Sequence, residues 1–419
     1  MYFFPELISI TSFGNTLIAN SEILTNGGNG RGGSLSIVAG NVTIYGSTLK
    51  ANSAIDGGQI QIIADRGDVN LQQSLIQTNG SNGLGGTILL SGVNSTFISS
   101  TEISATGFTQ GGTIKIGNDA TNQTIPFSRF TYLDSRALLN ASQQVSNSLI
   151  SNGGYIETSG HTIYMLASIN AGRGGIWLLD PTDIVISSSD PDVFSYSNNA
   201  SNSFGPSVSD PSNPRAPPSR SISDTLYSPL GSTPSYVNVN TLISGLNSGY
   251  SITVSTIGSS GSGSGDIYVN APITATDGSL SLTAAGTVNI DHAITLTGTY
   301  SQLYVEGTSI NVSANIRTTL SQQYNGPVIV SRSPTLTSNG GASGNPGFIV
   351  FGSTVDAESS GSSALTLSTT NPGAVAFGDS VGASNALSTL KVIGDTLFTS
   401  GLIKTIYEQE YEVANIRLA

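Results

Sequence analysis

A segment of seven residues recurs near the amino end of the chain at almost constant spacing. The copies read SEILTNG, STLKANS, SLIQTNG and TEISATG and begin at Ser21, Ser47, Ser74 and Thr101, so successive starts lie 26, 27 and 27 residues apart. A fixed period between about 20 and 50 residues is typical of repeat architectures, in which each unit packs on the next one. The period therefore excludes most globular folds at the outset.

Each copy is followed by a double glycine and a short run of alternating apolar residues. The double glycines are Gly32-Gly33, Gly57-Gly58, Gly85-Gly86 and Gly111-Gly112. Alternation predicts a strand with one buried side, and further apolar pairs such as Val42 and Ile44 raise the count to about three short strands per repeat. Three strands in about 26 residues predict a parallel β-helix whose coils stack at about 4.8 Å. We expect the glycines to supply positive-φ corners.

The period is interrupted twice, which divides the chain into three parts. Residues 1–187 are predicted to form a first β-helix section of three-strand coils with a decorated loop at 119–150, where ALLNASQQ reads as a short helical or irregular insertion. Residues 188–250 hold half of the sixteen prolines and are predicted to be a Pro/Ser/Asn-rich linker that ends in a short helix. Residues 251–419 are predicted to form a second section, with coils as short as 21 residues. The predicted class is all-β.

The short helix is predicted within VNVNTLISGLNSG. Thr241, Leu242, Ile243 and Leu246 have helical spacing. Asn240 is expected to cap this helix and Gly249 to end it, and we expect it to cover one side of the stack.

Composition restricts the partners. Only 10% of residues are charged and the net charge is −12, which argues against nucleic acid and anionic membranes as partners, since both require basic patches. Cysteine is absent, so stability is expected from stacking and not from disulfides. The first residues, MYFFPELISI, lack the basic region and cleavage site of a signal peptide. We expect an internal piece of a longer exported chain whose repeats continue beyond Ala419.

The stretch from 153 to 187 carries a family resemblance. GGYIETSG followed by GGIWLLDPTDIVIS resembles the junction of filamentous-haemagglutinin-like exoproteins of two-partner secretion systems, of the high-molecular-weight adhesin type. VNVNTLISGLNSGYSITVST, GSGDIYVNAPIT and GFIVFGSTVDA are similar to later parts of such proteins. The resemblance implies a right-handed parallel β-helix fibre that leaves the cell through an outer-membrane secretion pore. It implies an extracellular, cell-surface location and a role in adhesion.

Few residues suggest a specific site. Arg66-Gly67-Asp68 lies between two predicted strands, on a turn expected to be exposed, and is a receptor-binding candidate of the integrin-recognition type. The alternative is that Gly67 forms a corner and the two charges are merely solvated. Asp180, Asp183, Asp190 and Asp192 carry oxygens that suit calcium, but their spacing matches no calcium motif and Asp beside Pro is common turn chemistry.

Two carboxylate–histidine pairs complete the set of possible catalytic groups. Glu157 and His161 share one side of a predicted strand, which favours a contact between them, and Asp291 adjoins His292. Neither pair has a third partner, so an ordinary surface pair is the preferred interpretation and no catalytic, cofactor or metal residue is assigned. Asn-x-Ser/Thr sites at Asn41, Asn94, Asn122, Asn140, Asn199 and Asn311 leave glycosylation open, with stacked Asn or Ser ladders as the preferred interpretation.

The sequence thus predicts a non-enzymatic fragment of an extracellular bacterial fibre that adheres to cells or surfaces. Its expected partners are the secretion pore during export and glycans or proteins of host or neighbouring cells, without cofactor, nucleic acid or membrane insertion. Recognition is expected from the loops at 119–150 and 188–236. One alternative is a β-helical polysaccharide-active enzyme, which needs a groove with clustered carboxylates or a carboxylate with Arg or Lys. The other is a pure spacer.

Overall fold

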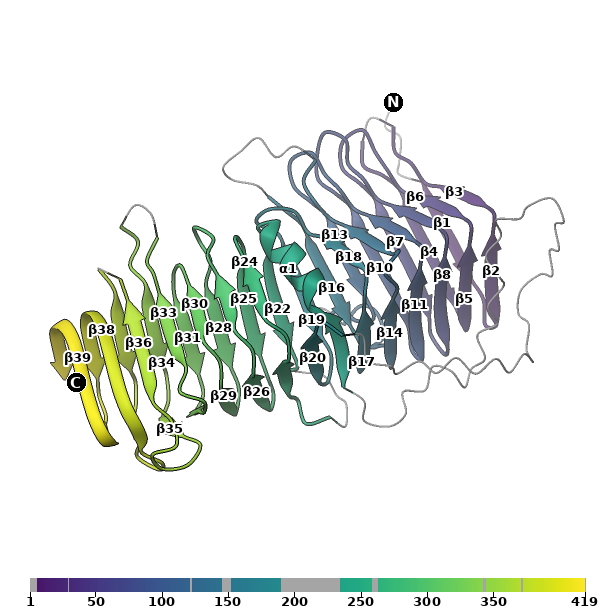
Figure 1. Cartoon of the computed structure of the whole chain (residues 1–419). Helices are drawn as coiled ribbons and strands as arrows, with labels where there is room; N and C mark the ends of the chain where they lie inside the picture. The colour runs from purple at the N-terminus through teal and green to yellow at the C-terminus, as the bar shows by residue number, and fades with distance from the viewer. Residues whose placement is uncertain are drawn as a thin grey trace.

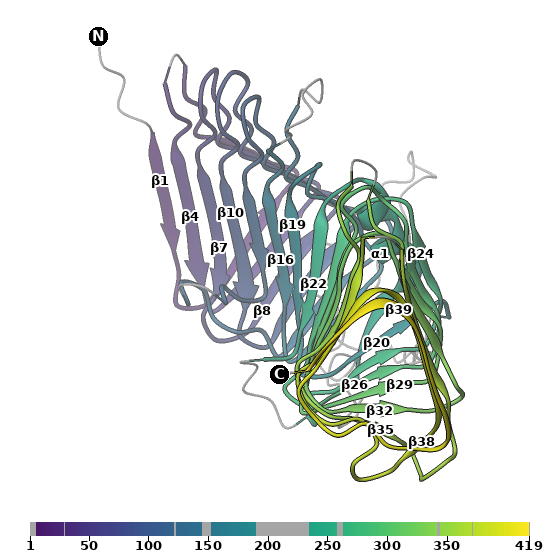
Figure 2. The same cartoon turned by 90° about the vertical axis from the view of Figure 1, so that its left-hand side faces the viewer.

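The chain forms a parallel β-helix, as predicted, in which short strands stack into an elongated body (Figure 1). The computed structural model describes residues 6–28, 30–120, 123–144, 152–189, 234–257, 263–341, 344–370 and 372–418. Seen nearly end-on, the coils have a three-sided outline (Figure 2). We call the three sides walls A, B and C, in the order in which each coil visits them.

Wall A runs the length of the stack, and its strands pair in parallel. Its strands, in stacking order, are β1 (Leu7–Thr11), β4 (Ser34–Ala39), β7 (Gln59–Ala64), β10 (Thr87–Gly92), β13 (Thr113–Ile116), β16 (Tyr155–Ser159), β19 (Ile176–Asp180), β22 (Ser251–Ser255), β25 (Ser279–Thr283), β28 (Leu303–Glu306), β31 (Gln322–Asn325), β34 (Phe348–Phe351) and β37 (Ala374–Phe377).

Wall B is a 13-stranded sheet. Its strands are β2 (Asn15–Ala19), β5 (Asn41–Tyr45), β8 (Asp68–Gln72), β11 (Ser95–Ser99), β14 (Phe130–Leu133), β17 (Thr162–Met165), β21 (Ser235–Asn238), β20 (Ile184–Ser187), β23 (Ile267–Val269), β26 (Thr287–Ile290), β29 (Ser309–Val312), β32 (Val328–Val330) and β35 (Val355–Ala357). The order departs from the sequence at one place, where β21 lies between β17 and β20.

Wall C begins as a six-stranded sheet, is interrupted by the helix, and then continues as strands. Its elements are β3 (Glu22–Leu24), β6 (Thr48–Lys50), β9 (Leu75–Gln77), β12 (Glu102–Ser104), β15 (Leu138–Asn140), β18 (Ser168–Asn170), α1 (Val239–Asn247), β24 (Ile273–Ala275), β27 (Ile294–Leu296), β30 (Ile316–Thr318), β33 (Thr335–Ser338) and β36 (Leu365–Thr369). The long strand β38 (Leu387–Thr399) pairs with both β36 and β37 and so joins walls C and A, and β39 (Thr405–Leu418) pairs with β38.

Alternating apolar residues place columns of side chains inside each wall. In wall A, Leu35, Ile60, Ile88, Ile114 and Ile156 stand in register on successive coils, and all are fully buried. Each such side chain contributes about 1.5–3 kcal/mol relative to an exposed one. The columns join into one hydrophobic core that extends from Ile18 to Leu397.

The double glycines have a different role from the one expected. Neither residue of these pairs has a positive φ. A Cβ built on Gly112 would lie 2.3 Å from the carbonyl oxygen of Gly86 and 2.6 Å from that of Ala105, so neighbouring backbones approach too closely for any side chain. Glycines do supply positive-φ corners at other positions, such as Gly46 and Gly117, whereas close backbone approach is the reason for these double glycines.

The positive-φ corner lies instead just before wall C, where each seven-residue repeat begins. Asn20, Gly46, Gln73 and Ser100 occupy it, with φ values of 49°, 55°, 48° and 50°. The hydroxyl that follows this corner bonds to two coils. The Oγ of Ser74 donates to the carbonyl of Gln72 at 2.8 Å and accepts from the backbone N–H of Ser47 at 3.2 Å.

Asparagines form a second ladder at the far end of wall C. The Oδ1 of Asn26 accepts from the N–H of Asn52 at 2.9 Å, and the Oδ1 of Asn52 accepts from the N–H of Asn79 at 2.7 Å. Asn41 and Asn311, each in an Asn-x-Ser/Thr sequence, donate to Asn15 and Asn289 one coil away. These hydrogen bonds confirm the predicted Ser and Asn ladders; Asn122 and Asn199 lie outside the described residues.

The interrupted region at 119–150 keeps more regular structure than predicted. Within ALLNASQQ, residues Leu138–Asn140 form strand β15, which pairs with β12 and β18. The helical or irregular interpretation is wrong there because cross-coil pairing overrides the local helical preference of Ala and Leu. The additional chain separates β13 from β14 and, within the described residues, includes 117–120 and 123–129.

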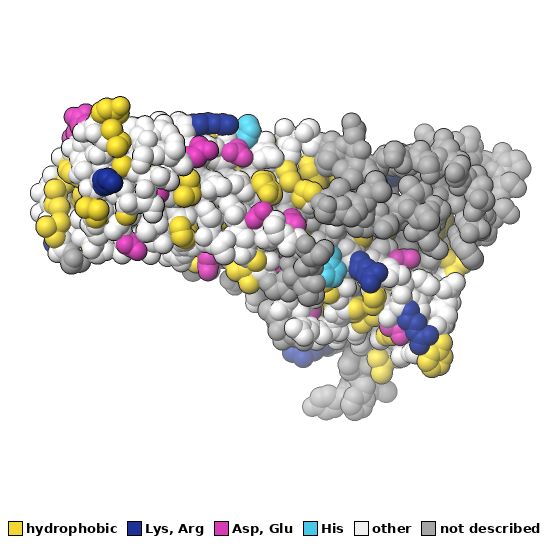
Figure 3. All heavy atoms as spheres, turned by 90° about the horizontal axis from the view of Figure 1, so that it is seen from below, with side chains coloured by type: hydrophobic (Ala, Val, Ile, Leu, Met, Phe, Trp, Pro, Cys, Tyr) yellow, Lys and Arg dark blue, Asp and Glu magenta, His cyan; other side chains and the backbone are white. Residues whose placement is uncertain are grey.

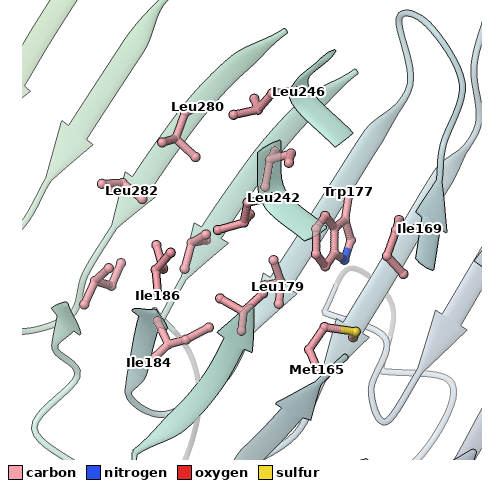
Figure 4. Close-up of a cluster of buried hydrophobic side chains, with 14 of the residues drawn as sticks. Met165, Ile169, Trp177, Leu179, Ile184, Ile186, Leu242, Leu246, Leu280 and Leu282 are labelled. Atoms are coloured by element: carbon pink, nitrogen blue, oxygen red, sulfur yellow. The ribbon is translucent and has the colours of Figure 1, made fainter. Parts of the chain in front are cut away.

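The predicted junction is continuous in the structure. Wall A passes directly from β19 to β22, and Leu242 and Leu246 of α1 pack into the core beside Trp177 and Leu179 (Figure 4). The helix occupies wall C between β18 and β24, so it takes the place of a strand. Residues 190–233, most of the predicted linker, lie outside the described residues.

The ends of the helix differ in part from the prediction. Its N-cap is Asn238, whose side chain accepts from the N–H of Asn240, so Asn240 is not the cap. Helical backbone begins at Val239, two residues earlier than the apolar spacing indicated. Gly249, with φ of 79°, follows the last turn as predicted.

Candidate functional site

The candidate site is a cluster of charged side chains on the outer surface of wall A. Because side chains alternate in a strand, Ile114 and Ile156 point into the core while Lys115 and Glu157 point outward. The register places Lys115 of β13 directly opposite Glu157 of β16. Two charged groups that are far apart in sequence are thereby adjacent.

Residues 117–120 and 123–129, which we call the segment 117–129 after its bounds, cover these outward side chains. It leaves wall A at Gly117, whose φ is 78°, and its Ile125 packs against Ile63 and Leu89 on the outer surface of the wall. The N–H of Ala120 donates to the Oε1 of Glu157 at 2.8 Å. The segment therefore buries a charged cluster that would otherwise face solvent.

The cluster holds one cation and two carboxylates. The Nζ of Lys115 contacts the carboxylate of Asp119 and lies 3.8 Å from the Oε2 of Glu157, and the three side chains are 8%, 3% and 0% exposed. Tyr155 and Ser159 donate hydroxyl hydrogen bonds to Glu157 at 3.3 and 3.1 Å. Burial raises the pKa of Glu157, although the Ala120 N–H and the charge of Lys115 act in the opposite direction.

A further buried carboxylate, Asp180, lies on the next coil. The register places it opposite Ser159, two residues from Glu157. Its Oδ1 has no hydrogen-bond partner within the described part of the chain. Burial, followed by the charge of Glu157, raises the pKa of Asp180 to about 7.

A shallow cavity of about 430 Å³ opens beside the cluster. It is lined by the threonines Thr87, Thr113 and Thr124, by Leu89 and Tyr155, and by the Lys115–Asp119 pair. Hydroxyls around an aromatic ring suit a polar, uncharged ligand such as a sugar, which needs hydrogen bonds at its edges and an apolar contact on its face. The charges of Lys115 and Asp119, the two charged residues in the cavity lining, cancel each other.

The Arg66-Gly67-Asp68 tripeptide is built into the wall of the coil. Asp68 is the first residue of β8, and its carboxylate accepts from Ser95 on the next coil at 2.7 Å. A Cβ on Gly67 would lie 1.9 Å from the Oδ1 of Asn41, so this residue is packed. Only Arg66 is well exposed, with its side chain beside Phe13. The structure does not bring the two charges together on a projecting loop.

The expected contact between Glu157 and His161 is absent from the described interactions. Glu157 is held by Lys115 and its hydrogen-bond donors, whereas the ring of His161 packs edge-on against Phe127 with centroids 4.4 Å apart. The strand β16 ends at Ser159, so the alternation that would put both residues on one side does not extend to His161. Asp291 and His292 are both exposed, and Asp291 accepts from Ser313.

Among the aspartates near the junction, Asp183 binds backbone N–H groups. The Oδ1 of Asp183 accepts from the N–H groups of Gly265 and Asp266 at 2.7 and 2.9 Å. Asp190 and Asp192 lie outside the described residues. In the part of the chain that the structure describes, no three Asp, Glu or His side chains are placed to hold a metal ion.

The outer surface of wall B carries a stack of aromatic rings. Phe97, Tyr132, Tyr164 and Tyr236 follow one another with centroid separations of 4.9, 5.6 and 5.2 Å. Their ring faces are occupied by each other, so the stack stabilises the wall and offers no flat surface for a sugar. Figure 3 shows that charged side chains are sparse on the described surface seen from below.

Sequence reasoning missed Lys115 and Asp119. One signal was present: Lys115 is a charged residue in a strand column where the preceding coil has Leu89, and the period breaks immediately afterwards. Comparisons with protein-family models, with curated proteins and with solved structures returned no match to the chain. Among the described residues, the helix is too short to cross a membrane.

Proposed function

We propose that the chain is a segment of an extracellular bacterial adhesive fibre, in which a rigid β-helix carries a binding site for uncharged glycans on the outer surface of wall A. The observation that carries this proposal is the cavity of about 430 Å³, lined by three threonines and Tyr155, on a stack with a continuous core. The fibre and its bacterial origin rest on the resemblance of residues 153–187 to secreted adhesins.

The electrostatics of the chain favour an uncharged ligand. The net charge of −12 repels polyanions, and the one cation in the cavity is already in contact with Asp119. A chain without cysteine also passes a secretion pore unfolded without a crosslink to break. We infer that stacking alone then stabilises the exported fibre.

The cavity lacks the groups that a polysaccharide-cleaving enzyme needs. Such an enzyme requires two carboxylates that reach the same sugar linkage, or a carboxylate with a free base. Asp119 lines the cavity, but Glu157 is fully buried beneath the segment 117–129 and Lys115 is held between the two carboxylates. The geometry therefore favours binding over cleavage.

The proposal is tested by glycan-array binding of the purified chain and of two arginine variants. Thr113 and Ser251 occupy the same register column of wall A, three coils apart. T113R places a long side chain into the cavity, whereas S251R adds the same charge to an exposed position elsewhere on the wall. We expect the native chain and S251R to bind the same uncharged glycans and T113R to lose this binding.

Two results would contradict the proposal. If the native chain binds no glycan, the segment is a spacer that holds other parts of the fibre at a distance. If T113R and S251R bind as the native chain does, recognition occurs outside the cavity.

A further inference from the structure

We propose that Lys115 and Asp119 are joined by an intramolecular isopeptide bond, formed between the Nζ of Lys115 and the side-chain carboxyl of Asp119, with Glu157 as the proton-transfer group. The bond would fasten the segment 117–129 to strand β13. The inference does not depend on glycan binding.

The two reacting groups are already held in contact. Lys115 lies in a strand of wall A, Asp119 follows four residues later, and the Nζ touches the carboxylate. The other oxygen of Asp119 accepts from the hydroxyl of Thr124 at 2.5 Å, which fixes the orientation of the carboxyl group. Such positioning supplies an effective concentration of about 10⁵–10⁸ M for well-oriented groups, which favours condensation of an amine with an acid.

Burial favours the neutral product of the reaction. An amine attacks only when it is unprotonated, and a carboxyl group loses its oxygen as water only when it is protonated. Condensation removes both charges from a site where Lys115 and Asp119 are each less than one-tenth exposed, and charges are costly in such a site.

Glu157 is placed to carry that proton. Its Oε2 lies 3.8 Å from the Nζ of Lys115, on the adjacent strand. Burial raises its pKa, so the protonated form is accessible. Its hydrogen bonds from Ala120, Tyr155 and Ser159 hold the carboxyl group in place.

The reaction balances without a further reactant. Glu157 accepts a proton from the ammonium of Lys115 and passes it to Asp119. The free amine attacks the carboxyl carbon of Asp119, and a second proton passes from the nitrogen through Glu157 to the hydroxyl of the tetrahedral intermediate. The C–O bond to that oxygen then breaks, and one water leaves as the amide forms. Nothing is oxidised or reduced. Condensation replaces one buried cation and one buried anion by a neutral amide.

The test is the mass of one tryptic peptide from the full chain, digested after denaturation. Lys115 is the only Lys or Arg between Arg66 and Arg129, and trypsin does not cleave after an acylated lysine. The proposal expects a single peptide spanning 67–129, about 18 Da lighter than its sequence mass, which is the loss of one water. Separate, unmodified peptides 67–115 and 116–129 would overturn it.

The chain contains an internal control. Lys391 forms ion pairs of 2.9 and 2.7 Å with Glu410 and Glu412, but all three side chains are substantially exposed. Trypsin should therefore cleave after Lys391, with no loss of water. A similar loss at Lys391 would show that contact alone is sufficient and would contradict the requirement for burial.

Two variants separate the bond from its mechanism. K115R retains a cation that does not condense and should have the full sequence mass. E157Q keeps Lys115 and Asp119 in place but has no group to accept the proton, and we expect it to yield the cleaved peptides 67–115 and 116–129 while its circular dichroism stays that of the native chain. Complete crosslinking in E157Q would remove Glu157 from the mechanism.

Discussion

The hydroxyl after each positive-φ corner is the residue that ties one coil to the next. In Ser74 it donates to the carbonyl of Gln72 and accepts from the N–H of Ser47 on the preceding coil. Thr101 occupies the equivalent position one coil later and donates to Ser99 in the same way. The ladder therefore explains why each copy of the seven-residue repeat begins with Ser or Thr.

We predict that S74A destabilises the chain by about 1–2 kcal/mol, because it leaves the N–H of the buried Ser47 without its hydrogen-bond acceptor. S74T should cost much less, since threonine already serves at position 101. Urea unfolding followed by circular dichroism, which reports on the strands of every coil, provides the measurement. Equal losses in the two variants would indicate a packing effect and not a hydrogen-bonding one.

We predict a pH dependence from Asp180. Its pKa rises from 3.8 in the unfolded chain to about 7 in the fold, so the folded chain holds this proton more tightly. Its contribution to stability is complete below about pH 4 and is lost as the pH rises towards 7. D180N removes the buried charge, so its free energy of unfolding relative to the native chain should be higher at pH 8 than at pH 5 by about 2–3 kcal/mol.

The control for this prediction is D183N, which should lose stability at both pH values because the Asp183 carboxylate accepts two backbone N–H groups. Urea unfolding midpoints of the native chain, D180N and D183N, measured at pH 5 and pH 8, test this prediction. A constant difference between D180N and the native chain would mean that solvent reaches Asp180.

For single residues, the sequence identified the ladder positions but not the charged cluster of Lys115, Asp119 and Glu157. The start of each repeat is visible because it recurs with the period. Lys115, Asp119 and Glu157 come together only through the register of β13 and β16, which are separated by the interruption of that period. The pairing of β13 with β16 spans this interruption, and no local sequence pattern shows which residues pair across it.

Among the elements, the strands of the first four repeats were predictable because alternation, turn residues and period agree. The helix α1 was predictable because its apolar residues have helical spacing and a glycine follows it. Strand β15 was not, since Ala and Leu favour a helix locally and only pairing with β12 and β18 determines its conformation. Close backbone approach at the double glycines was also hidden, because a sequence does not show which backbones will touch.

We predict that the double glycines tolerate no side chain. In G112A the new Cβ would meet two backbone carbonyl oxygens, at 2.3 and 2.6 Å, and neither can move without shifting a coil. We expect a loss of at least about 3 kcal/mol or failure to fold. G28A is the matched control, because nothing lies within 4 Å of a Cβ at Gly28. Circular dichroism and thermal unfolding distinguish the two, and similar unfolding temperatures would contradict the packing argument.

For the whole molecule, each coil contacts only its neighbours, so damage should remain local. L71A removes a fully buried side chain from β8, at a cost of about 2–5 kcal/mol. We predict faster amide hydrogen exchange in β5 and β11, the strands that pair with β8, and unchanged exchange in β34 and β37. Uniform acceleration along the chain would show that the stack opens as one cooperative unit.

The position of β21 in wall B determines the order in which neighbouring strands of this wall can pair as the chain emerges. Most strands of wall B pair with a strand made before them, so a chain that appears amino end first extends its wall step by step. Strand β20 is different, because both of its partners, β21 and β23, come later in the sequence. In a chain that emerges amino end first, β20 therefore has no strand to pair with until residue 238 has appeared. Wall B is not extended while about fifty residues emerge, and β21 then pairs between β17 and β20.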